Sequence, residues 1–160
     1  MSLLIAGLSP HPPLIIPEIG GDNLSKVTKT IESLQKLAEE YKKCNPDLLI
    51  TISPHGPVFR DAISVLEQSA LKGDFADFGH GEVKVEAETD MKFIEKLKEK
   101  AARVEINLVN QTEYADRDIS STALDHGVMV PLYYLQEAGL NVPVVALNMG
   151  LLNYEKLYKF

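Results

Sequence analysis

The chain has 160 residues, of which 45% are hydrophobic and 24% charged, a composition that indicates one globular domain and excludes a disordered chain. Its formal net charge of −7 at pH 7, without a lysine or arginine cluster, argues against nucleic acid as a partner. The single cysteine, Cys44, excludes an internal disulfide, and neither a secretory leader nor a transmembrane run is evident. We therefore expect a cytoplasmic protein with no membrane partner.

Hydrophobic periodicity and turn residues predict alternating strands and helices. The elements expected first are a strand at 3–8, a helix from Leu24 to Tyr41 capped by Asp22 and ended by Asn45 and Pro46, strands at 48–52 and 62–66, and a Gly- and Asp-rich loop at 72–82. Those expected later are a helix capped by Thr89, a strand at 104–109, an irregular segment at 110–122, a helix with Pro131 in its first turn and Gly139 after its end, a strand at 142–147, and a helix that begins at Asn153.

The alternation of strands with crossover helices predicts the α/β class, with a largely parallel or mixed sheet and helices on both faces. In sheets of this kind, ligands bind in the crevice beyond the carboxyl ends of the strands. Residues that follow the strands are therefore the first candidates for a functional site.

A five-residue pattern follows two of the predicted strands. It reads Ser-Pro-His-Pro-Pro at 9–13 and Ser-Pro-His-Gly-Pro at 53–57, so each strand would deliver one histidine, His11 or His55, at its carboxyl end. Proline fixes its own φ and restricts the residue before it, which orients each imidazole before anything binds to it. A single such histidine is more often a turn residue bonded to backbone. Because neither turn requires a histidine, the repetition favours a metal site.

Two further histidines have different surroundings. His126 lies just ahead of the helix that contains Pro131, where a neutral imidazole beside a metal could exchange hydrogen bonds with a substrate. It could instead cap the helix or pack against Asp125. His80 lies between two glycines in the expected loop and is interpreted as a solvated residue.

Three segments together resemble a known family. The sequences SPHPPLIIPEIG, SPHGP and LDHGVMVPLYYL occur in an order similar to that of the class III extradiol ring-cleaving dioxygenases of the LigB type. The similarity runs over essentially the whole chain and is nearest to the branch associated with AMMECR1-like domains. It implies a three-layer architecture like that of phosphorylase/hydrolase-like proteins. It also implies non-haem iron(II) that opens catechol-type rings with O2.

The resemblance also assigns roles to residues of this chain. His11 and His55 match the two histidine ligands of the iron, and His126 matches the catalytic histidine that approaches the substrate. We also expect Pro12, Gly56, Asp125 and His126 to contact the substrate. The implied partners are a small aromatic substrate and O2.

The chain also departs from the family pattern. LigB-type domains are usually longer, and their later half carries the carboxylate ligand and a further histidine base, for which 1–160 offers no counterpart. Glu82, Glu113 and Asp116 are candidate substitutes that spacing does not distinguish. We therefore expect a single LigB-like domain truncated at its C-terminus, either a fragment or a degenerate short homologue. Exposed surface of a partial domain predicts a homodimer or larger homo-oligomer.

Three functional hypotheses remain open from the sequence. The first is an iron(II) extradiol dioxygenase or the metal-binding portion of one. The second is a zinc-dependent hydrolase, since zinc on histidines can activate water. The third is a non-catalytic metal-binding or partner module that retains the fold.

Overall fold

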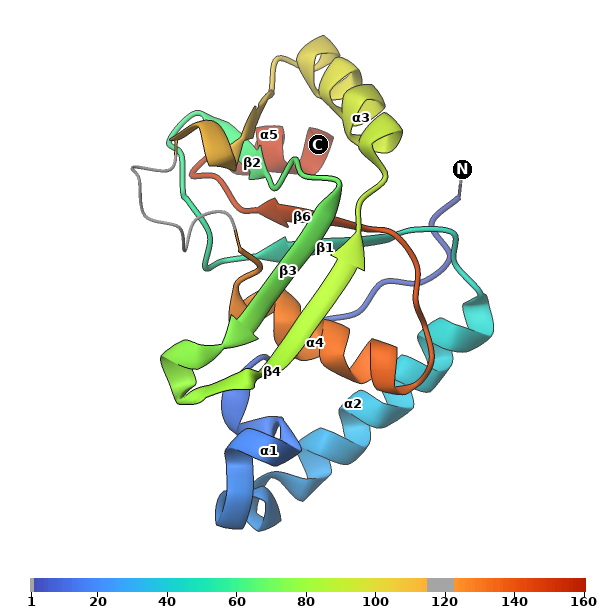
Figure 1. Ribbon diagram of the computed structural model, residues 1–160. Coiled ribbons are helices and arrows are strands. Elements are labelled where there is room, and N and C mark those ends of the chain that lie inside the picture. Colours follow the sequence, from blue (N-terminus) through green and yellow to red (C-terminus); the bar gives the residue numbers. More distant parts are fainter. Residues whose placement is uncertain (1, 115–122) are drawn as a thin grey trace.

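The computed structural model describes residues 2–114 and 123–160 and consists of two sheets and the helices that pack on them (Figure 1). The helices are α1 (Pro17–Gly20), α2 (Leu24–Cys44), α3 (Met91–Arg103), α4 (His126–Glu137) and α5 (Tyr154–Lys159). The strands are β1 (Leu49–Ser53), β2 (Ala62–Val65), β3 (Ala70–Phe75), β4 (His80–Glu88), β5 (Asn107–Asn110) and β6 (Val144–Asn148). Short 3-10 turns are η1 (Pro13–Ile15), η2 (Gly21–Asn23), η3 (Ala76–Phe78) and η4 (Gln111–Tyr114).

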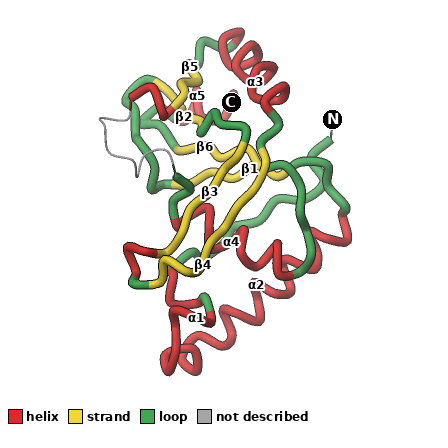
Figure 2. The backbone as a smooth tube through the Cα atoms, in the orientation of Figure 1, coloured by secondary structure: helices red, strands yellow, loops and turns green. Residues whose placement is uncertain are grey.

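The larger sheet has four strands in the order β1-β6-β2-β5 (Figure 2). β1 pairs with β6 and β2 pairs with β5 in parallel, whereas β2 and β6 are antiparallel. The prediction of an α/β fold with a mixed, mostly parallel sheet is therefore confirmed. Ser53 lies opposite Asn148, so β1 and β6 end side by side.

Helices cover both faces of this sheet, as expected. On one face, α2, α4, η1 and the β3–β4 hairpin share the main core, which includes Ile15, Leu34 and Val130. On the other face, α3 and the chain end pack against the sheet around Val65, Ile94 and other apolar residues. β1 is an edge strand of the described sheet, and Ile50 and Ile52 on it remain exposed.

The predicted loop at 72–82 is wrong, because this segment belongs to an antiparallel hairpin of β3 and β4. Alternate residues of the hairpin are buried, among them Leu71, Phe75, Val83 and Val85. This period of two is the burial pattern of a strand, and glycine and aspartate near the turn had obscured it. Gly79, with φ of 81°, supplies the left-handed residue that the turn requires.

The predicted strand at 3–8 is also wrong. These residues are described, and they form no ladder with any described strand; Leu3 and Leu8 are 85% and 97% exposed. The segment instead approaches α2, where a Cβ on Gly7 would lie 3.0 Å from the Tyr41 hydroxyl oxygen and 3.4 Å from Leu37. An apolar run becomes a strand only where a neighbouring strand offers free backbone groups, and composition does not reveal that neighbour.

Several helix ends differ from the predicted ones. Asp22 lies in η2 ahead of α2, and α3 is capped by Asp90, which accepts the Phe93 N–H at 2.9 Å, rather than by Thr89. α4 already begins at His126, so Pro131 lies beyond its first turn. The predicted start of a strand at 104 is delayed to Asn107.

Other boundaries agree with the sequence. Asn45, the residue after the end of α2, lies in the left-handed region with φ of 45° and caps the helix, and Asn153 caps α5 by accepting the Lys156 N–H. Within residues 2–114 and 123–160, no helix has both the length and the apolar character needed to cross a membrane.

Candidate metal centre

Three histidines from distant parts of the chain come together at one place. His11 precedes η1, His55 follows β1, and His126 begins α4. One ring nitrogen of each lies within 4.8 Å of those of the other two. The Nε2 atoms of His11 and His55 are 2.9 Å apart.

The His11 turn is held by the residues that follow it. Ile15 and Ile16 are fully buried, and their backbone N–H groups bond to the carbonyls of Pro12 and Pro13 at 3.1 and 2.9 Å. The Tyr134 hydroxyl of α4 donates to the Ile15 carbonyl. These contacts fix the turn against the core although the preceding segment forms no strand in the described chain.

The His55 turn is joined to α4 by a single carboxylate oxygen. The hydroxyl of Ser53, a fully buried residue, donates to Asp125 Oδ1 at 2.6 Å and accepts the His55 backbone N–H at 3.2 Å. The same Asp125 oxygen accepts the Gly127 N–H at 2.7 Å and so caps α4. Asp125 therefore connects the turn that carries His55 to the helix that begins with His126.

Gly127 allows this close approach. A Cβ at this position would lie 2.4 Å from Ser53 Oγ and 3.0 Å from His55 Cδ2. Glycine is therefore required at the position after His126 by packing rather than by backbone conformation.

The His126 ring packs on that of His55. Their centroids are 4.0 Å apart at 35°, and the ring of Phe78, from the hairpin turn, meets His126 edge-on at 5.4 Å. Burial lowers the pKa of His126 below its usual value, and the neighbouring His55 lowers it further. The imidazole is therefore expected to be neutral at pH 7 and able to donate or accept a hydrogen bond.

The other residues named from the sequence lie in different surroundings. His80 pairs through Nδ1 with Glu82 Oε1 at 3.0 Å, so it is not merely a solvated residue. Among the described residues, the cluster contains neither Glu82 nor Glu113, and Asp116 lies outside the described residues. Pro12 is exposed, and the Gly56 N–H bonds to Asn148.

Sequence reasoning missed four residues that shape the site. Ser53 was noted only as part of a motif, and Phe78 was placed in a loop. Asn148 and Gln111 are buried polar residues at strand ends, a combination that could have marked them had the strand ends been known.

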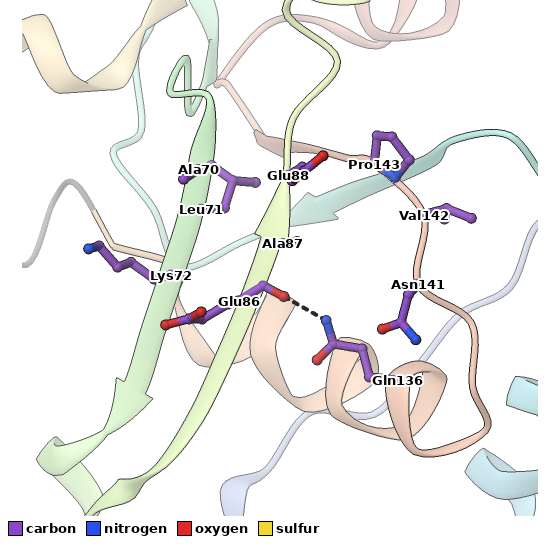
Figure 3. A pocket seen from close by; sticks show the side chains of 10 residues that line it. All are labelled: Ala70, Leu71, Lys72, Glu86, Ala87, Glu88, Gln136, Asn141, Val142 and Pro143. Carbon is purple, nitrogen blue, oxygen red and sulfur yellow. Dashed lines mark hydrogen bonds between the residues drawn. The ribbon is translucent and has the colours of Figure 1, made fainter.

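A separate cleft of about 500 Å³ lies between the β3–β4 hairpin and the far end of α4 (Figure 3). Gln136 lies at its wall and donates through Nε2 to the Glu86 carbonyl at 2.7 Å. Since His126 is the first residue of α4 and Gln136 is near its last, this cleft and the histidine cluster lie at opposite ends of the helix.

The donor set fits a transition-metal ion. With metal–nitrogen bonds of about 2.1 Å, two nitrogens in adjacent octahedral positions lie about 3.0 Å apart, and in tetrahedral positions about 3.4 Å. The 2.9 Å between the Nε2 atoms of His11 and His55 is nearer to the octahedral value. Without a cation, one of these nitrogens must carry a proton and donate to the other.

The fold and the cluster define an α/β protein with a candidate three-histidine metal centre. The family model for the catalytic LigB subunit of aromatic ring-opening dioxygenase matches residues 5–160. The chain therefore belongs to the LigB family, which confirms the resemblance seen in its motifs. It is also 31% identical over 161 residues to Protein CA_C1420 of Clostridium acetobutylicum. That alignment covers 100% of this chain and 34% of the relative, so the chain spans about a third of its length.

Proposed function

We propose that this chain carries the two-histidine part of a non-haem iron(II) centre and takes part in extradiol opening of a catechol-type ring with O2. The observation that carries the proposal is the 2.9 Å approach of His11 Nε2 to His55 Nε2 in a member of the LigB family. Bound iron(II) would supply open positions for two substrate oxygens and for O2, and would let electron density pass from the ring, which is oxidised, to O2, which is reduced.

His126 has a distinct role in this proposal. Its neutral imidazole stacks on His55 and is not needed as a ligand, so it is available to hydrogen-bond a substrate hydroxyl and hold its proton. Phe78 and the turns that contain Gly56 and Gly127 would bound the substrate beside it. The third, carboxylate ligand would come from outside the described cluster, with Asp116 as one candidate.

We expect the chain, reconstituted anaerobically with iron(II), to bind about one ion and then to produce a yellow ring-fission product from catechols in air. His126→Gln keeps the size of the side chain but removes the imidazole base, and should lower the rate by about 10²- to 10⁴-fold. The iron content measures metal binding, and the rise in product absorbance measures the rate of ring opening. Failure to bind iron would contradict the metal centre, whereas binding without product would contradict the activity.

A zinc-dependent hydrolase is the second candidate, because three histidines within 4.8 Å resemble the ligand set of a catalytic zinc site. The two candidates differ in the role of His126. As a substrate-facing base it can be replaced with glutamine while metal affinity changes by less than about 3-fold, but as a zinc ligand its loss should weaken binding by more than about 100-fold. Isothermal titration of the wild type and of His126→Gln, with zinc and with anaerobic iron(II), distinguishes the two candidates.

We further propose that the chain self-associates through the edge of β1. Ile52 is 62% exposed there, Ile50 is exposed on the same face, and a strand at the edge of the described sheet with exposed apolar side chains favours addition of another strand.

Ile52→Lys is expected to shift the chain from a dimer or larger assembly to a monomer in light scattering coupled to size-exclusion chromatography. A lysine on the edge opposes pairing by charge. The control is Val104→Lys, which places the same charge at an exposed apolar residue after α3. A wild-type chain that is already monomeric at the concentrations used would contradict the proposal.

A further inference from the structure

We propose that Asn148 and Gln111 form a buried amide pair that positions the turn carrying His55. This inference deepens the proposed function and depends on it only for the role of His55 as a ligand. Neither amide belongs to the histidine motifs, and both lie at the ends of strands, Asn148 at the end of β6 and Gln111 directly after β5.

The first contact joins Asn148 to the His55 turn. Asn148 is 4% exposed, and its Oδ1 accepts the N–H of Gly56, the residue after His55, at 3.1 Å. The backbone of Asn148 pairs with Ser53 in the sheet, and the Met149 N–H bonds to the Ser53 carbonyl at 3.1 Å. The amide therefore extends from a backbone already fixed beside the strand that leads to His55.

The second contact orients the amide. Asn148 Nδ2 donates to Gln111 Oε1 at 2.5 Å, and Gln111 is also 4% exposed. Because the Gly56 N–H can only donate, it requires the oxygen of Asn148 on its side and so directs the nitrogen toward Gln111. The pair thus satisfies buried polar groups that would otherwise lose their hydrogen bonds.

The turn also lies in close contact with this amide. A Cβ at Gly56 would lie 1.9 Å from Asn148 Nδ2, so the turn can approach only because residue 56 has no side chain. Ser53 and Asp125 hold the amino side of the turn, and Asn148 holds its carboxyl side.

This support matters because the His55 side chain is itself exposed. Core packing does not restrain an exposed imidazole, so its position depends on its own backbone and on the neighbouring rings of His11 and His126. A small rotation of the turn would change the 2.9 Å distance to His11 Nε2. Residues that orient metal ligands in this way affect metal affinity without touching the metal.

The test compares Asn148→Leu with Asn148→Asp. Leucine has the same branching at Cγ but leaves the Gly56 N–H without its acceptor, and we expect the affinity for cobalt(II) to fall by about 10- to 100-fold. Aspartate retains the acceptor, and Gln111 can rotate its amide to donate to it, so this variant should stay within about 3-fold of wild type. Gln136→Leu is the control, because it removes a side-chain amide contact at the opposite end of α4.

A second readout does not require metal. In the metal-free protein, the Gly56 amide should exchange with deuterium at least about tenfold faster in Asn148→Leu than in wild type, and the His55 ring resonances should shift. Gln111→Leu should have a smaller effect in the same direction, which keeps the test available if Asn148→Leu does not fold.

The outcomes separate the inference from the proposed function. If wild type binds no metal, the proposed function fails. The deuterium exchange rate of the Gly56 amide and the shift of the His55 ring resonances then decide whether the amide pair positions the turn. Unchanged exchange and resonances in Asn148→Leu would overturn the inference. Faster exchange with unchanged cobalt(II) affinity would overturn it as well, because the pair would then be only structural.

Discussion

Replacing His55 with alanine is expected to lower the affinity for iron(II) or cobalt(II) by more than about 100-fold, because loss of a ligand exceeds the 10- to 100-fold effect of losing an outer partner. His55 supplies one of the two Nε2 atoms that lie 2.9 Å apart, and its side chain is exposed. The free energy of unfolding should therefore change by less than about 0.5 kcal/mol. Titration calorimetry and urea denaturation measure the two quantities on the same sample.

His80→Ala is the control for this substitution. His80 is a partly exposed histidine that pairs with Glu82 on the hairpin and does not belong to the cluster of ring nitrogens. It should leave both metal affinity and stability near those of wild type. Equal loss of affinity in the two variants would mean that the metal binds nonspecifically, and no loss in His55→Ala would place the metal elsewhere.

The largest effect on stability is expected at Asp125. Asp125→Ala removes the cap of α4, worth about 1 kcal/mol, and leaves the buried Ser53 hydroxyl without its acceptor, which costs about 1–3 kcal/mol. Together these losses should lower the free energy of unfolding by about 2–4 kcal/mol. The decrease should appear in urea denaturation followed by circular dichroism, with metal affinity falling as well.

Asp125→Asn distinguishes the hydrogen bonds from the charge. Asparagine is a good capping residue, and its Oδ1 can still accept the Ser53 hydroxyl and the Gly127 N–H, so less than about 1 kcal/mol should be lost. If asparagine and alanine destabilise the protein equally, the charge of Asp125 rather than its position as an acceptor would be responsible.

The orientation of each histidine could be expected from local sequence because each turn carries its own constraint. Prolines flank His11 and His55, and Asp125 caps the helix at His126, so each imidazole is oriented within a few residues. The α/β class followed from the alternation of periodicities for a similar reason, since strong periodicity is a local property.

Features that depend on distant partners could not be predicted in this way. The segment at 3–8 has the composition of a strand, but whether it pairs depends on the strands available to it. The hairpin was missed because the glycines and aspartates that form its turn also characterise loops. Asn148 and Gln111 carry no motif, and only the tertiary fold brings their amides together beneath Gly56.

The carboxylate oxygen of Asp125 has a consequence for how the centre opens. This one atom accepts hydrogen bonds from both Ser53 and Gly127. Opening of the turn that carries His55 should therefore weaken the first turn of α4, and opening of that helix turn should weaken the His55 turn. The two segments should therefore behave as one cooperative unit in native-state hydrogen exchange, with a common opening free energy for the amides of His55 and Gly127. An ion held between the histidines would slow both amides equally, so their exchange would report occupancy of the centre even in an inactive chain.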